Sequence, residues 1–355
     1  MLRVMSTRPN WTTNLSKYKC LSCGGDRWLA YSTIWTCEQC GKEYPCVSGI
    51  PRLYIETDLG ERDKELRDRL YNGFLGTYYQ HVMPFMSLPV RPARANWKGW
   101  LVYGLTVLFE LFLLAYLANL VFVRSPGYPK ATSIAVAVLF ISSLLFLYRH
   151  PYLLYLLILA VPVKVSILLK RFRPVESFAQ VHANVLKEVL GSKERLQVLD
   201  ISTGTCNSLY RHGWMKLNAD YTGLDLSETM LLQGLKFMSN ERVAMDFVLG
   251  DATKLPFQDG MFDIVLNYGA INGFTNPRVA LEEMARVCKK GGLVLFLDEQ
   301  LYEGATFIEK LYFKKVLSSH NVIHRCPVEL IPASLGDVKV HQVYHFYYIC
   351  TCHKI

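Results

Sequence analysis

Charged residues are sparse in this 355-residue sequence, and acidic residues are nearly absent from its middle. Asp, Glu, Lys and Arg make up 19% of the chain and hydrophobic residues 51%, which excludes an intrinsically disordered protein. No cysteine lies between Cys46 and Cys206, so the ten cysteines do not have the pattern of a disulfide-stapled framework. Residues 1–16 contain no continuous apolar run and no A-x-A-like cleavage site, so no secretory signal is expected.

The net charge of +9 is distributed unevenly along the chain. Residues 91–175 hold ten basic side chains and one acidic side chain, whereas residues 176–355 hold 18 basic and 20 acidic ones. A basic protein can bind nucleic acid or an anionic membrane. Because the excess surrounds long apolar segments, it indicates membrane orientation and contact with lipid head groups. Membrane lipids are therefore expected partners, and nucleic acid is not.

Two apolar runs predict a transmembrane helical hairpin within a membrane segment at residues 100–173. Residues 101–123 and 131–148 approach the roughly 20 helical residues that span a bilayer core. Residues 152–169 are also apolar, but Pro162 and Lys164 interrupt them. We expect two spans and then an interfacial or re-entrant helix, so that both ends of the chain lie on the cytoplasmic side. A third span, or a buried hairpin in a soluble protein, is the alternative.

Four cysteines predict a metal site near the N-terminus. The pairs Cys20-x2-Cys23 and Cys37-x2-Cys40 are separated by thirteen residues, a spacing at which four thiolates can enclose one tetrahedral Zn²⁺. A four-thiolate site is coordinatively closed, so this zinc is expected to be structural. Iron in a rubredoxin-like site and a redox dithiol are the alternatives.

The residues that follow the second cysteine pair read Y-P-C-V-S-G-I-P-R-L from Tyr44 to Leu53. They resemble the Y-P-x-x-x-G-I-P-x-L signature of zinc-ribbon proteins that activate methyltransferases. The resemblance implies a zinc ribbon at residues 1–58 and a surface through which it can bind a protein partner. Residues 62–83 resemble the helical segment that methyltransferases place over their active site, which predicts an N-terminal cap at residues 59–99.

From residue 174 onward, short apolar runs alternate with helical patterns, which predicts a parallel sheet with helical crossovers. Strands are expected at 196–201, 221–226, 247–250, 262–267 and 293–297. Helices are expected at 177–190, 227–238 and 277–290. The segments 338–343 and 346–352 are expected to form an antiparallel hairpin at the edge of the sheet.

Sequence motifs stand in a fixed order at the ends of these strands. They are V-L-D-I-S-T-G-T-C at 198–206, an acid at Asp225, G-D-A at 250–252 and F-D-I-V at 262–265. This order resembles class I S-adenosylmethionine-dependent methyltransferases, especially the ubiquinone/menaquinone C-methyltransferase-like group. The resemblance implies an α/β fold with a seven-stranded Rossmann-like sheet at residues 174–355 and S-adenosylmethionine as cofactor.

The resemblance also implies which residues hold the cofactor. It implies that the methionine part of the cofactor is lined by Asp200, Ser202, Gly204 and Cys206. It places the ribose at Asp225 and Leu226 and the adenine at Asp251 and Ala252. Asn267 and Tyr268 are expected to face the methyl-transfer region. The family usually has G-x-G-x-G in the first loop, and here only Gly204 remains of the three glycines. Side chains at the other two positions are expected to narrow the crevice. The G-x-G-x-x-G spacing of a dinucleotide site is absent.

A membrane segment that interrupts the cap places the mouth of the active site near the lipid surface. We therefore expect a membrane-anchored methyltransferase of a lipidic acceptor, such as an isoprenoid quinone precursor, a sterol or a phospholipid head group. The alternatives are an anchored enzyme with a soluble or protein substrate, a nucleic-acid methyltransferase, and a non-catalytic scaffold with a degenerate methyltransferase domain. An oxygen or carbon acceptor needs a general base. The candidates, which no spacing distinguishes, are Tyr268, Glu299, His320 and His324.

Overall fold

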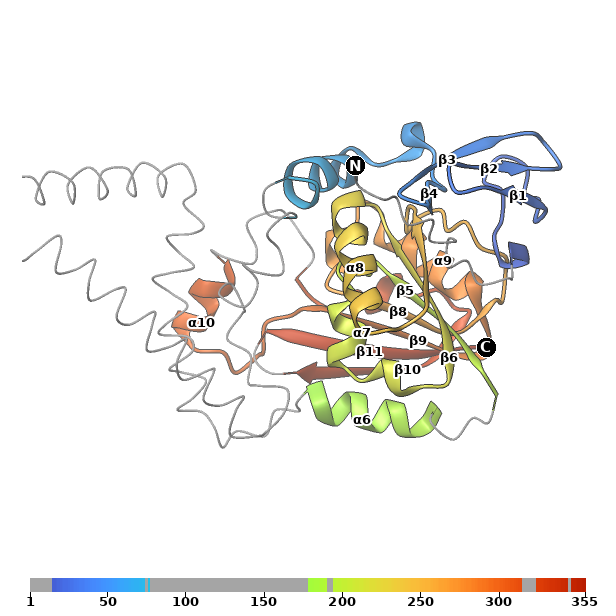
Figure 1. Ribbon diagram of the computed structural model, residues 1–355. Coiled ribbons are helices and arrows are strands. Elements are labelled where there is room, and N and C mark those ends of the chain that lie inside the picture. Colours follow the sequence, from blue (N-terminus) through green and yellow to red (C-terminus); the bar gives the residue numbers. More distant parts are fainter. Residues whose placement is uncertain (1–14, 74–75, 77–177, 190–193, 315–323, 344–345) are drawn as a thin grey trace, which may run out of the picture.

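The computed structural model describes residues 15–73, 76, 178–189, 194–314, 324–343 and 346–355. They form a four-stranded sheet that packs on a seven-stranded sheet (Figure 1). The predicted transmembrane hairpin, the apolar segment 152–169 and His320 lie outside the described residues. Among the helices within these ranges, none combines the length and the apolar character that crossing a membrane requires.

The larger sheet has the seven strands and the terminal hairpin that the sequence predicts. Its strand order is β10-β11-β9-β8-β5-β6-β7. Neighbouring strands from β9 to β7 pair in parallel, and β11 pairs antiparallel with both β9 and β10. The strands are β5 (Leu196–Ile201), β6 (Ala219–Asp225), β7 (Met245–Leu249), β8 (Phe262–Tyr268), β9 (Cys288–Glu299), β10 (Leu335–Val343) and β11 (Tyr347–Lys354).

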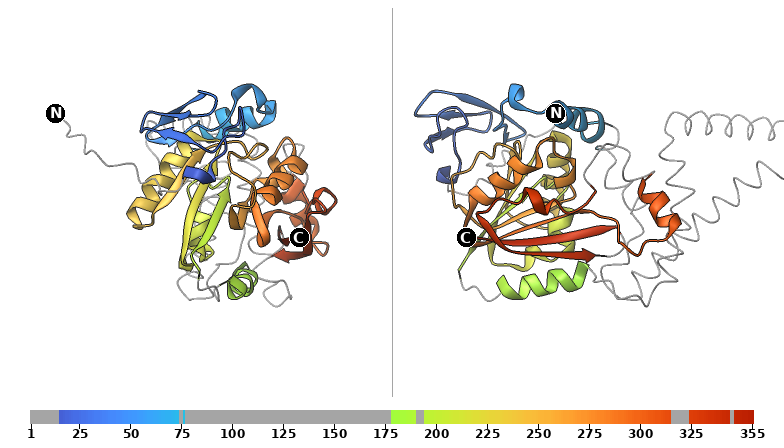
Figure 2. Two further views of the ribbon diagram at one scale, coloured as in Figure 1. Left: turned by 90° about the vertical axis from the view of Figure 1, so that its right-hand side faces the viewer. Right: turned by 180° about the vertical axis from the view of Figure 1, so that it is seen from behind.

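Helices cover both faces of this sheet (Figure 2). Alternate strand residues enter two separate cores, so that Val198 of β5 belongs to one and Leu199 to the other. The first core also contains residues of α6 (Phe178–Val189), α7 (Asn207–Arg211) and α8 (Glu228–Asn240), and the second contains residues of α9 (Pro277–Val287). Central strands covered on both sides are apolar on both sides, which explains why they appear in the sequence as continuous apolar runs.

The prediction of a helix at 277–290 is wrong for its last turn. The helix α9 ends at Val287, and Cys288 is extended with φ −75° and ψ 136°. Residues 288–292 instead begin β9, where the register against β8 shifts between Phe262 and Ile264. Gly291 has φ 76°, a conformation that glycine adopts without a steric penalty. The Lys-Lys-Gly-Gly run therefore forms an irregular strand start.

The small sheet is a four-stranded antiparallel ribbon with an aromatic core. Its strands are β1 (Trp28–Ala30), β2 (Ile34–Cys37), β3 (Glu43–Val47) and β4 (Ile50–Pro51), paired in chain order. The ring of Trp35 lies 5.0 Å from that of Tyr18 and 5.7 Å from that of Trp28, measured between ring centroids. A module this small buries too little surface to be stable alone, so it needs a metal or a partner surface.

The ribbon docks against the large sheet beside β7. Arg52 pairs in parallel with Leu249 at the end of β7, and the backbone N–H of Leu53 donates to the carbonyl of Leu249 at 2.8 Å. At the other side of the ribbon, Tyr18 pairs antiparallel with Phe257. The ribbon and the sheet share one hydrophobic core, to which Tyr18 and Leu53 both belong.

A buried ion pair lies within this contact. The Nζ atom of Lys17 donates to Asp246 Oδ2 at 2.6 Å and to Thr222 Oγ1 at 2.8 Å. Lys17 is 3% exposed and Asp246 2% exposed. The pair therefore joins the start of the ribbon to β6 and β7.

The described part of the predicted cap crosses the carboxyl ends of the strands. It consists of α1 (Glu61–Glu65) and a π-helical turn at Leu66–Tyr71. Lys254 Nζ donates to Asp58 at 2.7 Å, and Ser227 Oγ donates to Asn72 Oδ1 at 2.8 Å. Lys254 follows β7 and Ser227 follows β6, so this segment lies over the edge where the predicted cofactor residues end their strands.

Candidate functional site

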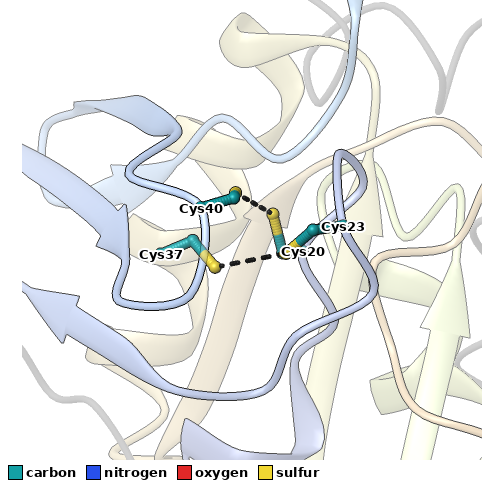
Figure 3. Close-up of side chains that lie close together, drawn as sticks. All are labelled: Cys20, Cys23, Cys37 and Cys40. Atoms are coloured by element: carbon teal, nitrogen blue, oxygen red, sulfur yellow. Dashed lines mark hydrogen bonds between the residues drawn. The ribbon is translucent and has the colours of Figure 1, made fainter.

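The four predicted metal ligands converge in the ribbon (Figure 3). The sulfur atoms of Cys20, Cys23, Cys37 and Cys40 all lie within 4.8 Å of one another. The Cys20–Cys40 distance is 3.7 Å and the Cys23–Cys37 distance 3.6 Å. Four sulfurs around a tetrahedral zinc at ordinary bond lengths are about 3.8 Å apart. The cluster therefore has the donor set and the spacing for one Zn²⁺ ion.

The predicted cofactor residues gather at the carboxyl edge of the large sheet. Asp225 ends β6, Asp251 follows β7, and Tyr268 ends β8. The carboxylate of Asp225 joins two loops, since the N–H of Gly204 donates to Oδ2 and the N–H of Ser227 to Oδ1, both at 2.8 Å. Burial raises the pKa of Asp225 and of Asp251. Ligands of open α/β sheets bind in the crevice at this edge.

Two buried acceptor atoms at this edge have no hydrogen-bond donor among the described residues. Asp200 is 1% exposed, and its Oδ2 accepts from the Thr203 hydroxyl at 2.6 Å while Oδ1 has no partner. Asn267 is fully buried, and its Nδ2 donates to the Ile201 carbonyl at 3.0 Å while Oδ1 has no partner. Unpaired buried acceptors are costly. A ligand with N–H donors, such as the ammonium group of a methionine moiety, fits them.

We predict that Asp200 makes the ligand-free protein less stable as the pH rises. Burial, with a further contribution from Asp225, raises the pKa of Asp200 to about 7. An unfolded aspartate titrates near 3.9, so between about pH 4 and 7 the folded state binds more protons and stability falls with pH. The Asp200→Asn variant has no carboxyl group to ionise, so its stability does not fall in this way. Between pH 4 and pH 8 we expect its free energy of unfolding, measured in urea, to rise by about 2–4 kcal/mol relative to that of the wild type.

The matched control for this pH effect is Asp337→Asn at an exposed position. A hydrogen bond from Lys339 lowers the pKa of Asp337, so this variant loses stability relative to the wild type as the pH rises. As the pH rises, the two substitutions are therefore expected to change the stability relative to the wild type in opposite directions. A stability difference between Asp200→Asn and the wild type that does not change with pH contradicts the prediction.

The first loop keeps the backbone of a glycine-rich loop although two of its glycines are replaced. Ser202, Gly204 and Cys206 have φ values of 57°, 52° and 61°, all left-handed. A side chain in this conformation costs about 1–2 kcal/mol. The sulfur of Cys206 is buried 3.9 Å from Met245 Sδ and 3.6 Å from Thr203 Oγ1. This side chain therefore packs in the core and does not narrow the crevice, contrary to the expectation from the sequence.

We predict that Ser202→Gly stabilises the protein. Glycine adopts the left-handed conformation without a steric penalty, and its larger backbone entropy in the unfolded state offsets part of the gain, leaving about 0.5–1 kcal/mol. The control is Ser202→Ala, which keeps the Cβ atom and should show no gain. Urea denaturation of the two variants measures the difference. A glycine variant less stable than the alanine variant contradicts the assigned strain.

A polar cluster that no sequence spacing indicates surrounds Tyr268. Trp214 Nε1 donates to the Tyr268 hydroxyl at 2.5 Å, and His182 Nε2 lies 2.8 Å from the same oxygen. The ring of His212 stacks on that of His182 with centroids 4.1 Å apart. These side chains come from α6, from the region after α7 and from β8, so only the fold brings them together. Burial raises the pKa of Tyr268.

The other described base candidates lie in different surroundings. Glu299 ends β9, and burial together with the neighbouring Asp298 raises its pKa. His324 packs edge-on against Phe313 with ring centroids 5.2 Å apart. Tyr268 interacts electrostatically with Asp200 and therefore lies close to the predicted methionine end of the cofactor site.

Known proteins resemble part of this chain. The chain is 34% identical over 149 residues to the ubiquinone/menaquinone biosynthesis C-methyltransferase of Ruegeria sp. (strain TM1040), covering 41% of the chain and 58% of that protein. It is 35% identical over 143 residues to the demethylmenaquinone methyltransferase of Staphylococcus haemolyticus (strain JCSC1435), covering 38% and 56%. The chain thus spans less than two thirds of the length of these relatives.

A solved structure and a family model also match part of the chain. Phosphoethanolamine N-methyltransferase 2 of Haemonchus contortus in complex with S-adenosyl-L-methionine is 16% identical, with a TM-score of 0.41 over 49% of this chain and 52% of that one. The family model described as a methyltransferase domain matches residues 199–296, from β5 to β9. The predicted cofactor residues from Asp200 to Tyr268 therefore lie within the segment that matches the methyltransferase-domain model.

Proposed function

We propose that this protein is an S-adenosylmethionine-dependent methyltransferase that methylates an isoprenoid quinone-type acceptor at a membrane surface. The observation that carries the proposal is a methyltransferase domain whose strand ends hold three buried or half-buried carboxyl groups and two unpaired acceptor atoms. The names of the relatives, a ubiquinone/menaquinone biosynthesis C-methyltransferase and a demethylmenaquinone methyltransferase, support the class of acceptor.

The chain offers a distinct group for each part of the cofactor. Asp200 and Asn267 present acceptors to the ammonium group of the methionine part. Asp225 accepts from the ribose hydroxyls beside Leu226, and Asp251 accepts from the adenine amino group next to Ala252. The cofactor supplies a methyl group on a sulfonium. The residues hold this group in line with the acceptor, because correct positioning supplies much of the rate enhancement of a bimolecular transfer.

In the sequence, the proposed membrane segment lies between two elements that contact residues of the strand-end site. Before it, Asn72 accepts a hydrogen bond from Ser227 beside Asp225. After it, His182 of α6 contacts Tyr268. We propose that the membrane segment at 100–173 anchors the enzyme at the side from which a lipidic acceptor arrives, and that the ribbon and the methyltransferase domain both lie on the cytoplasmic side.

Calorimetry and a transfer assay test the proposed function. The full-length protein in detergent should bind S-adenosylmethionine and S-adenosylhomocysteine, and label from the cofactor should appear in a demethylated quinol supplied in vesicles. Undetectable binding at millimolar cofactor by a folded sample would favour a non-catalytic scaffold. Label that appears only in protein or in soluble small molecules would refute the lipidic acceptor.

We predict that Asp225→Ala weakens binding of S-adenosylmethionine by about 100-fold or more. The substitution removes a charged acceptor, and each hydrogen bond to such a group contributes about 1.5–3 kcal/mol. It also frees the N–H groups of Gly204 and Ser227, which the carboxylate now holds. The matched control is Asp220→Ala near the opposite end of the same strand, where the carboxylate binds Arg195. Equal losses in the two variants, measured by calorimetry, contradict the assigned role.

A further inference from the structure

The hydrogen bonds around the Tyr268 hydroxyl leave one of its lone pairs available to a substrate. An indole N–H can only donate, so Trp214 occupies one lone pair of the phenol oxygen. The second contact is with His182 Nε2 at 2.8 Å. When the phenol donates its proton to Nε2, the oxygen retains one further lone pair that can accept a proton from a bound molecule.

The three residues of the hydrogen-bonded cluster differ in their exposure. Trp214 is fully buried and His182 is 2% exposed, whereas Tyr268 is partly exposed. Tyr268 also ends β8 at the edge where Asp200 and Asn267 present their unpaired acceptors. Of these three residues, Tyr268 is therefore the one that combines partial exposure with a position at the strand-end edge, and we assign the contact with an acceptor to it.

The surroundings of His182 are suited to holding a single proton. His212 from the end of α7 stacks on it with an interplanar angle of 9°. Burial, His182 and Arg211 together keep the pKa of His212 well below its usual value, so His212 stays neutral beside a charged neighbour. Among the described residues, the charged groups that act on this cluster include Asp200 of β5, which acts on Tyr268, and Arg211 of α7, which acts on His212.

We propose that Tyr268 and His182 form the proton relay of the methyl transfer, with Tyr268 as the catalytic contact and His182 as the positioning residue that takes the proton. The inference rests on the proposed function. As the acceptor bonds to the methyl carbon, the electron pair of the S–C bond stays on sulfur. The acceptor hydroxyl loses its proton to the Tyr268 oxygen, its O–H electron pair forms a C=O bond, and a π electron pair of the ring forms the new C–CH3 bond. The Tyr268 proton passes to His182 Nε2, and tautomerisation then moves the hydrogen of the methylated ring carbon to the carbonyl oxygen. The positive charge of the sulfonium is thereby replaced by that of the imidazolium, so no net charge is created in the buried site.

Kinetics of the full-length protein as a function of pH test the relay. Tyr268→Phe should lower kcat by about 10²-fold or more, the contribution of general acid–base catalysis, while the Kd for S-adenosylmethionine changes less than about threefold. His182→Gln keeps a hydrogen-bond acceptor near the phenol but cannot take the proton. It should lower kcat and abolish the fall in kcat at acid pH that protonation of His182 causes in the wild type.

Tyr348→Phe is the matched control, because it also removes a buried phenol hydroxyl, one that donates to Asn272 Oδ1 at 3.1 Å. It should leave the pH profile unchanged. A Tyr268→Phe enzyme with kcat within twofold of the wild type, or a His182→Gln enzyme that keeps the acid limb, overturns the relay. A wild type that binds no S-adenosylmethionine overturns the proposed function itself, which separates the two failures.

Nitrogen NMR of labelled histidine gives a readout that does not depend on activity. The relay requires neutral His182 to carry its proton on Nδ1, with Nε2 accepting from Tyr268. The His182→Gln spectrum assigns the signal. An unprotonated Nε2 near pH 7.5 that changes in Tyr268→Phe supports the relay. A protonated Nε2 at the same pH means that His182 donates to the phenol, and this result overturns the proposal.

Discussion

Loss of the Zn²⁺ ion that we propose for the four-cysteine site is expected to unfold the ribbon and to weaken cofactor binding at the same time. Structural zinc contributes about 10–16 kcal/mol in zinc-finger peptides, far more than a core of a few aromatic rings provides. The ribbon pairs through Arg52 with Leu249, two residues before Asp251 of the predicted adenine site. Loss of this pairing leaves the end of β7 without its neighbour. We therefore expect Cys37→Ser to reduce cofactor affinity by at least tenfold.

Limited proteolysis and near-ultraviolet circular dichroism measure the unfolding, since Trp28 and Trp35 belong to the ribbon. Chelator treatment of the wild type should reproduce the effect of Cys37→Ser. Cys46→Ser is the matched control, because Cys46 lies in the same ribbon with its sulfur near the Tyr31 carbonyl and outside the four-cysteine cluster. A ribbon that resists protease after chelation, or a control as sensitive as Cys37→Ser, contradicts the assigned role of the metal.

Local sequence patterns were sufficient to predict the strands of the large sheet and the cluster of four cysteines. The strand at Leu196–Ile201 is observed with the predicted bounds, because a short apolar run flanked by polar and glycine-rich turns has few other ways to fold. The two cysteine pairs converge because each pair occupies one tight turn, where Gly24 and Gly41 have left-handed backbones. Where local sequence alone decides the conformation, the prediction is close to the structure.

Contacts between distant residues were not accessible from the sequence. His182 and Tyr268 are 86 residues apart, and no motif links them. His182 lies among the apolar residues of α6, where a histidine is compatible with an ordinary core position. The left-handed backbone of Ser202 and Cys206 was also hidden, because composition indicates which residues replace glycine and not whether the loop keeps its shape.

The ribbon surface that the resemblance assigned to a partner is partly occupied within the same chain. Leu53 donates to Leu249, Gln258 donates to the Lys17 carbonyl and Lys19 donates to the Pro256 carbonyl, so both sides of the ribbon bind the methyltransferase domain. The ribbon is thus held by the large sheet of its own chain. Any further protein partner is expected to use the surface of the ribbon that faces away from β7.

Lys17→Met is expected to destabilise the protein by about 3–5 kcal/mol, the usual cost of leaving a buried charge without its partner. Methionine keeps the apolar stem of lysine but removes the ammonium group, which is bonded to Asp246 and Thr222 and also lies 5.2 Å from the centroid of the Tyr18 ring. Lys17 precedes the ribbon and Asp246 lies in β7, so the loss should appear both in urea unfolding and as faster proteolysis of the ribbon.

The double variant Lys17→Met with Asp246→Leu separates the ion pair from general packing. Replacing both charges by apolar groups of similar size is often neutral or stabilising, because the desolvation of both ions is then avoided. We therefore expect the double variant to recover most of the stability that Lys17→Met loses. A single variant that costs less than about 1 kcal/mol, or a double variant that is less stable than Lys17→Met, would show that the pair does not fasten the ribbon to the sheet. If the double variant recovers its stability but the ribbon stays sensitive to protease, the ion pair determines the position at which the ribbon docks on the sheet. The shared hydrophobic core then determines the strength of that contact.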